Sequence, residues 1–158
     1  MLALIGIVAV IIAFDQWTKR WMEVHLAEGP ITVIDGLLWW SYSENTGASF
    51  GMFKQGGVFL GLAAVAVTAL IVWYLSAVET RGELIGLALV LGGALGNLTD
   101  RIVRGEGVLD GAVIDFIRVP NFPNFNVADS CITVGVVFLL ALSFRSHQGT
   151  ETVTESAN

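Results

Sequence analysis

Long apolar segments alternate with polar connections along this chain, and their lengths indicate membrane spans. A helix needs about 20 predominantly apolar residues to cross the hydrocarbon core of a bilayer. The clearest case is Val58–Ala77, which contains no charged residue. Met1–Phe14 is shorter and gains its spanning length from the next one or two helical turns. We therefore predict four spans, at about residues 1–20, 58–77, 84–102 and 127–144.

The connections between these spans differ greatly in length. Only residues 78–83 join the second and third spans, so these two spans are expected to form an antiparallel hairpin. Because the number of spans is even, both termini lie on one side of the membrane and the long connections, 15–57 and 99–130, on the other. We predict one membrane-embedded domain, residues 1–147, followed by a disordered polar tail, residues 148–158.

The first long connection contains the pattern of a β-hairpin. Ile31–Ile34 is rich in β-branched residues, Asp35-Gly36 is a strong turn sequence, and Leu37–Ser43 continues as a second strand. The predicted fold is therefore an all-α integral membrane protein with four transmembrane helices and a small antiparallel β-sheet in the first connection. We expect this sheet to lie on the membrane surface. An amphipathic loop is the alternative.

Composition agrees with a membrane protein and excludes several other classes. Hydrophobic residues make up 54% of the chain and charged residues 14%, whereas soluble domains carry about 25% charged residues. The net charge of −6 and the scattered basic residues give no sign of a nucleic-acid partner. His25 and His147 lie far apart, and no Cys/His spacing suggests zinc. We expect neither a metal nor a cofactor.

Two aspartates stand out because each lies at the edge of an apolar stretch. Asp115 follows Ala112-Val113-Ile114, and Asp129 begins the fourth span. An ionisable group at membrane depth costs about 2.5–3.5 kcal/mol on insertion scales, so such groups usually serve a function. Two carboxyl groups sharing one site split their pKa values, which provides a base and an acid together. For Asp129 alone, a favourable charge at a helix amino terminus is an equally good explanation.

Other polar residues cluster at helical spacing on the third and fourth spans. Asn97, Asp100 and Arg101 share one helix face, as do Asn126 and Asp129. Asn97 needs hydrogen-bond partners in an apolar helix, and the guanidinium of Arg101 could hold backbone carbonyls or a lipid headgroup. For Asp100, an ion pair at the end of the helix is the favoured interpretation.

Three further sequence features have simple structural explanations. Asp15 and Lys19 are four residues apart, which by default indicates an ion pair on the surface. Asn45–Phe50, which includes Gly47, is a turn sequence. The pattern of small residues in Gly92–Gly96 would allow a neighbouring helix to approach closely, although a glycine-rich helix can contain it by chance.

The basic residues are distributed unevenly between the two sides of the predicted topology. Six of the eight lie in or beside the two long connections: Lys19, Arg20, Lys54, Arg101, Arg104 and Arg118. The positive-inside rule therefore predicts that these connections face the cytoplasm.

Five sequence blocks together resemble the bacterial lipoprotein signal peptidase family, signal peptidase II. They occur in the family's order and cover nearly the whole chain. They are Asp15-Gln16-x-x-Lys19, Asn45-Thr46-Gly47-Ala48-x-Phe50, the run Gly92–Arg101, Val113-Ile114-Asp115-Phe116 and the run Phe125–Ser130. No motif position departs from the family pattern.

The resemblance implies specific roles for the residues of these blocks. Asp115 and Asp129 match the catalytic pair of an aspartic endopeptidase. Positions that shape the site or hold substrate are matched by Asn45, Asn97, Arg101 and Asn126. Positions that support the site structurally are matched by Asp15, Lys19, Gly47 and Asp100.

The resemblance also implies a substrate and a location. The family removes the signal peptide from prolipoproteins just before a diacylglyceryl-modified cysteine, and the cyclic peptide globomycin inhibits it. We therefore expect lipidated prolipoproteins, membrane lipids and globomycin-type inhibitors as partners, and a monomer. The implied location is the bacterial inner membrane, with the site near the extracytoplasmic face and both termini in the cytoplasm. This orientation is the reverse of the one that the positive-inside rule predicts.

Other functions are conceivable for membrane-embedded carboxylates. A proton- or ion-coupled transporter would use them near mid-membrane on broken helices, whereas here they lie at one boundary. A membrane scaffold or lipid-binding module would explain the surface sheet but not Asp115. A prepilin-type peptidase shares the chemistry, but its motifs do not match.

Overall fold

The computed structural model describes residues 1–47 and 56–155, with residues 146–155 described as backbone alone. In these residues the chain forms four long helices, one short 3-10 helix and three strands. In chain order they are α1 (Leu2–His25), β1 (Ile31–Ile34), β2 (Leu38–Asn45), α2 (Gly56–Tyr74), η1 (Leu75–Ala77), α3 (Arg81–Val103), β3 (Val113–Arg118) and α4 (Val127–Glu155).

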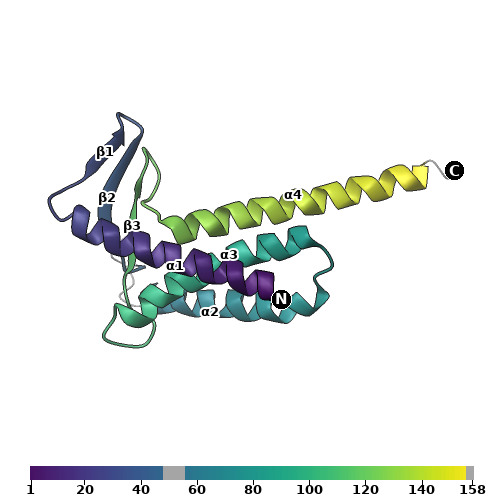
Figure 1. The fold of residues 1–158 in the computed structure, drawn as a ribbon, viewed down its shortest axis with the longest axis horizontal. Helices are drawn as coiled ribbons and strands as arrows, with labels where there is room; N and C mark the ends of the chain where they lie inside the picture. The colour runs from purple at the N-terminus through teal and green to yellow at the C-terminus, as the bar shows by residue number, and fades with distance from the viewer. Residues whose placement is uncertain (48–55, 156–158) are drawn as a thin grey trace.

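The helices run alongside one another, the sheet gathers at one end of the bundle, and both termini lie toward the opposite end (Figure 1). Within the described residues, four helices are long and apolar enough to cross a membrane, as the predicted number of spans requires. Apolar side chains such as Phe59 and Val72 on α2 point outward. Exposed apolar surface on this scale suits contact with lipid.

Two helices are longer than the sequence pattern indicates. α1 continues to His25 rather than ending near residue 20. α4 continues to Glu155, so residues 148–155 have a helical backbone where we expected disorder, while residues 156–158 lie outside the described part. Once a helix has formed, each further residue adds a hydrogen bond without a new nucleation cost.

α3 lies at the centre of the bundle because its glycines allow its neighbours to approach closely. A Cβ atom at Gly92 would lie 2.9 Å from Ile11 of α1, and one at Gly93 would meet the backbone oxygen of Ala128 on α4. A Cβ at Gly96 would lie 2.9 Å from the carboxylate of Asp15. The predicted close-packing role of these small residues is confirmed.

The sheet is antiparallel, with the strand order β1-β2-β3. The predicted hairpin of β1 and β2 is confirmed, and Gly36 in its turn has φ +68. β3 is a third strand that the sequence pattern did not indicate. It pairs with β2 through Ser43↔Asp115 and Asn45↔Val113. Residues 113–116 are buried on both faces, so their sequence lacks the alternation that predicts a half-exposed strand.

Candidate active site

The pairing of β2 with β3 brings Asn45 next to Asp115. The two residues come from different connections, 70 positions apart, and the side-chain Nδ2 of Asn45 donates a hydrogen bond of 3.0 Å to Asp115 Oδ2. The amide oxygen of Asn45 accepts the backbone N–H of Gly47 at 2.9 Å. Because that oxygen is engaged, the NH₂ group of Asn45 is directed at the carboxylate.

Asp129 lies in the first turn of α4 and is held there by Asn126. The Asn126 side-chain oxygen accepts the backbone N–H of Asp129 at 2.9 Å, and Asp129 Oδ2 accepts the backbone N–H of Asn126 at 3.2 Å. These reciprocal hydrogen bonds have the geometry of a capping box. The capping interpretation of Asp129 is therefore correct, and the same bonds place its carboxylate in the site.

Asn126 also joins the two predicted carboxylates. Its Nδ2 donates to Asp115 Oδ1 at 2.7 Å, while its backbone N–H contacts Asp129. The Asn126 side chain is fully buried. A buried amide with its partners satisfied rigidly fixes the groups around it. The structure therefore brings Asp115 and Asp129 together through one shared residue.

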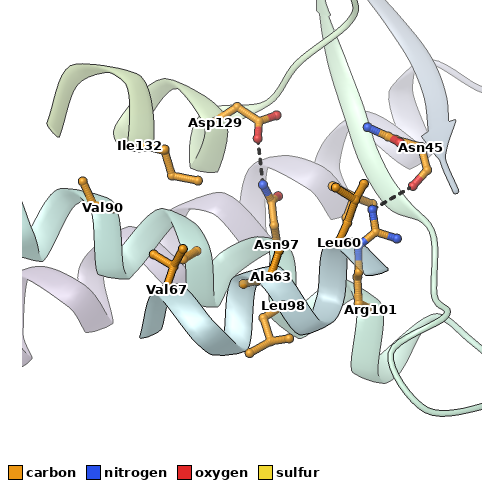
Figure 2. Close-up of a pocket in the computed structure, with 13 residues that line it drawn as sticks. Asn45, Leu60, Ala63, Val67, Val90, Asn97, Leu98, Arg101, Asp129 and Ile132 are labelled. Carbon is orange, nitrogen blue, oxygen red and sulfur yellow. Dashed lines mark hydrogen bonds between the residues drawn. The ribbon is translucent and has the colours of Figure 1, made fainter. Parts of the chain in front are cut away.

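Asn97 of α3 completes the shell around the pair. Its Nδ2 donates to Asp129 Oδ1 at 2.8 Å, and Figure 2 shows this hydrogen bond reaching from α3 to α4. Its Oδ1 accepts from Asn126 at 3.1 Å and from Lys19 at 3.0 Å. Each of the four carboxylate oxygens of Asp115 and Asp129 thus accepts a hydrogen bond from an N–H group.

Burial, and after it the nearby charge of Asp129, raise the pKa of Asp115 to about 6. The hydrogen bonds from Asn45 and Asn126 favour the ionised form and act against this shift. Asp115 lies in β3, outside the spanning helices. Its carboxyl group can therefore hold or release a proton a little below neutral pH.

Asp15 and Lys19 form a buried ion pair, so the interpretation as a surface pair is wrong. Both side chains are completely buried, and Lys19 Nζ lies 2.8 Å from Asp15 Oδ2 and 2.7 Å from Asp100 Oδ2. The third acceptor of Lys19 is Asn97, so all three ammonium protons have partners. Asp15 also accepts the backbone N–H of Ala128 at 3.0 Å, which ties α1 to the first turn of α4.

Three residues that the sequence interpretation did not assign complete this network. Arg104 donates to Asp100 Oδ1 at 3.1 Å and pairs with Glu23 of α1 at 2.6 Å. Gln16 donates to Asp100 Oδ1 at 3.0 Å and to the Gly96 carbonyl oxygen at 3.2 Å. The spacing of Asp100 and Arg104, four residues apart on one helix, could have indicated that pair.

Lys19→Met should strongly destabilise the protein, because it leaves the buried carboxylates of Asp15 and Asp100 without their shared cation. Breaking a buried ion pair from one side typically costs about 3–5 kcal/mol. Thermal unfolding in detergent measures the effect. Arg20→Met is the matched control, since Arg20 is the exposed neighbour on the same helix. Equal unfolding temperatures for the two variants would contradict a supporting role for Lys19.

Arg101 and Gly47 hold the backbone around the site. The Arg101 guanidinium donates to the carbonyl oxygens of Gly111 at 3.0 Å and of Asn45 at 3.5 Å, so it contacts this chain's own backbone. Gly47 has φ +77, and a Cβ there would lie 2.5 Å from the Gly56 carbonyl carbon. Both the backbone angle and the space therefore require glycine. Residues 48–50 of the predicted turn sequence lie outside the described residues.

A cavity of about 280 Å³ lies beside Asp129, between α2, α3 and α4 (Figure 2). Most of its wall is apolar and comes from membrane-spanning helices, with Ala63 and Val67 on α2 and Val90 on α3. Its polar groups gather at one end. They are Asn45, Asn97, Arg101 and Asp129. This arrangement can accept apolar side chains directly beside the carboxylate of Asp129.

The nearby carboxylates do not form a metal-ligand cluster. Within the described parts of the chain, no group of three or more His, Cys, Asp or Glu side chains is placed to hold a metal ion. Two carboxylates bridged by a buried amide are instead suited to sharing a proton and activating a water molecule.

This chain is similar to known proteins over nearly its whole length. Residues 7–145 match the family described as Signal peptidase (SPase) II. A lipoprotein signal peptidase of Symbiobacterium thermophilum is 42% identical, with 92% of this chain and 96% of that protein covered. A lipoprotein signal peptidase of Pseudomonas syringae pv. tomato is 40% identical, with 98% of this chain and 92% of that protein covered.

Solved structures show the same architecture. Two structures described as bacterial membrane enzymes, solved by the in meso method, are similar to this one. The first has a TM-score of 0.78 at 25% sequence identity, with 94% of this chain and 92% of that chain covered. The second has a TM-score of 0.79 at 28% sequence identity, with 90% of this chain and 92% of that chain covered.

Proposed function

The chain belongs to the signal peptidase II family, and from that premise we propose that Asp115 and Asp129 are the catalytic pair of an intramembrane aspartic endopeptidase. Its substrates would be prolipoproteins, cut just before the diacylglyceryl-modified cysteine. The observation that carries this proposal is the bridge formed by Asn126. It connects a carboxylate of β3 with one of α4 at the polar end of a cavity among the spanning helices.

The chemistry needs one ionised and one protonated carboxyl group. Asp129, ionised, takes a proton from a water molecule, and the water oxygen attacks the scissile carbonyl carbon. Asp115, protonated, donates a hydrogen bond to the carbonyl oxygen and stabilises its developing negative charge. When the carbon–nitrogen bond breaks, the nitrogen receives the proton that Asp129 took from the water molecule, so the products are the carboxylic acid of the signal peptide and the amine of the lipidated cysteine.

The surrounding residues divide into two groups by their contacts. Asn45, Asn97 and Asn126 donate directly to the carboxylates, and they are our candidates for contacting the substrate backbone once it displaces some of these bonds. Arg101 lines the cavity and is a further candidate. The second group supports the site without a hydrogen bond to either carboxylate of the pair. It consists of Asp15, Lys19, Gly47 and Asp100.

We propose the orientation implied by the family, with the sheet end of the bundle facing away from the cytoplasm. The positive-inside rule concerns basic residues in and beside the loops, whereas the Lys19 side chain is completely buried inside the bundle. Arg101 is buried against backbone carbonyls. With Lys19 and Arg101 left out of the count, the excess of basic residues on the sheet side is smaller.

The decisive test of this function is cleavage of a matched pair of peptides in detergent or lipid. One carries the signal sequence with a diacylglyceryl-modified cysteine, and the other has the same sequence without the lipid. We expect cleavage of the lipidated peptide before its cysteine, inhibition by globomycin, and at least about a hundredfold lower kcat/KM for the unlipidated peptide. Equal cleavage of both peptides would contradict the proposed specificity, and cleavage of neither would contradict the proposed activity.

A further inference from the structure

A second cavity is lined by Asp115 rather than by Asp129. Its volume is about 360 Å³, and Asp115 forms part of its wall. The rest of the wall comes from the end of β2, including Glu44, from Thr46 directly after β2, and from Pro123 and Asn124 before α4. None of these residues belongs to a membrane-spanning helix.

The two cavities differ in the character of their walls. The cavity beside Asp129 is built mainly from apolar side chains of α2 and α3, whereas the cavity beside Asp115 is built mainly from polar groups outside the spans. Asn45 lines both, and its side chain donates to Asp115. A polypeptide whose scissile bond lies at the carboxylate pair would therefore have an apolar environment on one side of that bond and a polar one on the other.

A signal peptide and the mature segment that follows it differ in the same way. The signal peptide is an apolar helix, which suits the cavity between the spanning helices. The polypeptide after the cut has to leave the membrane and is hydrated. The direction of the chain through the site follows from this match.

We propose that the polar cavity beside Asp115 binds the extended mature segment directly after the lipidated cysteine, and that Glu44 selects against acidic residues in it. This inference rests on the proposed function. Glu44 is exposed, and its carboxylate accepts a hydrogen bond of 2.7 Å from the Tyr42 hydroxyl, which holds it in place. The charged groups of the cavity wall are Glu44 and Asp115, and the described wall contains no basic side chain. A basic residue in the segment is attracted to this wall, and an acidic one is repelled.

Three lipidated peptides test this assignment. They are identical except that the two residues after the cysteine are both lysine, both serine or both aspartate. For the unmodified enzyme we expect kcat/KM to fall in that order, by about five- to tenfold from lysine to aspartate, since an exposed charge pair changes binding only modestly. Added salt should reduce the difference.

Variants of Glu44 separate this inference from the proposed function. Glu44→Gln should make the three rates nearly equal, and Glu44→Lys should favour the aspartate peptide. Glu28→Lys makes the same charge change at an exposed position outside the cavity wall and should keep the original order. If the unmodified enzyme and Glu44→Lys rank the peptides identically, the assignment of this cavity is overturned while the proposed function stands. If the unmodified enzyme cleaves none of the three, the proposed function itself fails.

Discussion

Asp115→Asn and Asp129→Asn should each lower kcat/KM for a lipidated prolipoprotein peptide by at least about a thousandfold. Proton transfer by a positioned side chain typically contributes 10²–10⁴-fold, and residues that act as one unit lose nearly all of that when either is removed. An asparagine fills the same space but cannot take a proton from water. Peptide cleavage followed by mass spectrometry measures the loss.

The matched control is Asp35→Asn, which makes the same substitution in the exposed turn between β1 and β2. It should keep the activity of the unmodified enzyme. Asp115→Asn should also remain folded, because the raised pKa of Asp115 means that its ionised form destabilises the folded protein above about pH 6. We expect it to unfold at pH 8 at or above the temperature of the unmodified enzyme. A variant of either aspartate that keeps more than a tenth of the activity would contradict the assignment.

Activity should fall about tenfold for each pH unit above the pKa of Asp115. That pKa is raised from 3.8 to about 6 by burial and by the charge of Asp129. The protonated form is therefore present below about pH 6 and is lost as the pH rises through that value. Because the proposed chemistry needs a protonated Asp115, kcat/KM at pH 9 should be about a thousandfold below its maximum. Measuring kcat/KM for the lipidated peptide as a function of pH tests this decrease.

Two controls distinguish titration of the pair from loss of the fold. Thermal unfolding across the same pH range should show a folded protein throughout. In Glu44→Gln, kcat/KM should begin to decrease at the same pH as in the unmodified enzyme, since Glu44 is not among the causes of the raised pKa of Asp115. A rate that is constant or rises between pH 6 and pH 9 would contradict the role of Asp115 as the proton donor.

Much of the fold could be predicted from the sequence because its strongest signals are local. Apolar length predicted the four spans, and the Asp35-Gly36 turn predicted the hairpin of β1 and β2. β3 was missed because its residues are buried on both faces and its partner strand is about 70 positions away. Pairing over that distance depends on tertiary packing, which local patterns do not report.

The residues of the site could be named in advance, but their connections could not. The pair Asp115 and Asp129 was predicted from their apolar surroundings and from family resemblance, whereas the bridging contacts of Asn126 appear only in three dimensions. Spacing showed that Asp15 and Lys19 are neighbours but not that they are buried. The Asp15 carboxylate can pack against α3 because Gly96 leaves room for it.

The central claim is that the two carboxyl groups act as one catalytic unit, and a double-mutant cycle tests it most directly. It compares kcat/KM for the unmodified enzyme, Asp115→Asn, Asp129→Asn and the double variant on one lipidated peptide. The bridge through Asn126 predicts that the double variant is no slower than the slower single variant, because either change already disables the unit. Losses that multiply in the double variant would show two independent contributions and contradict this account.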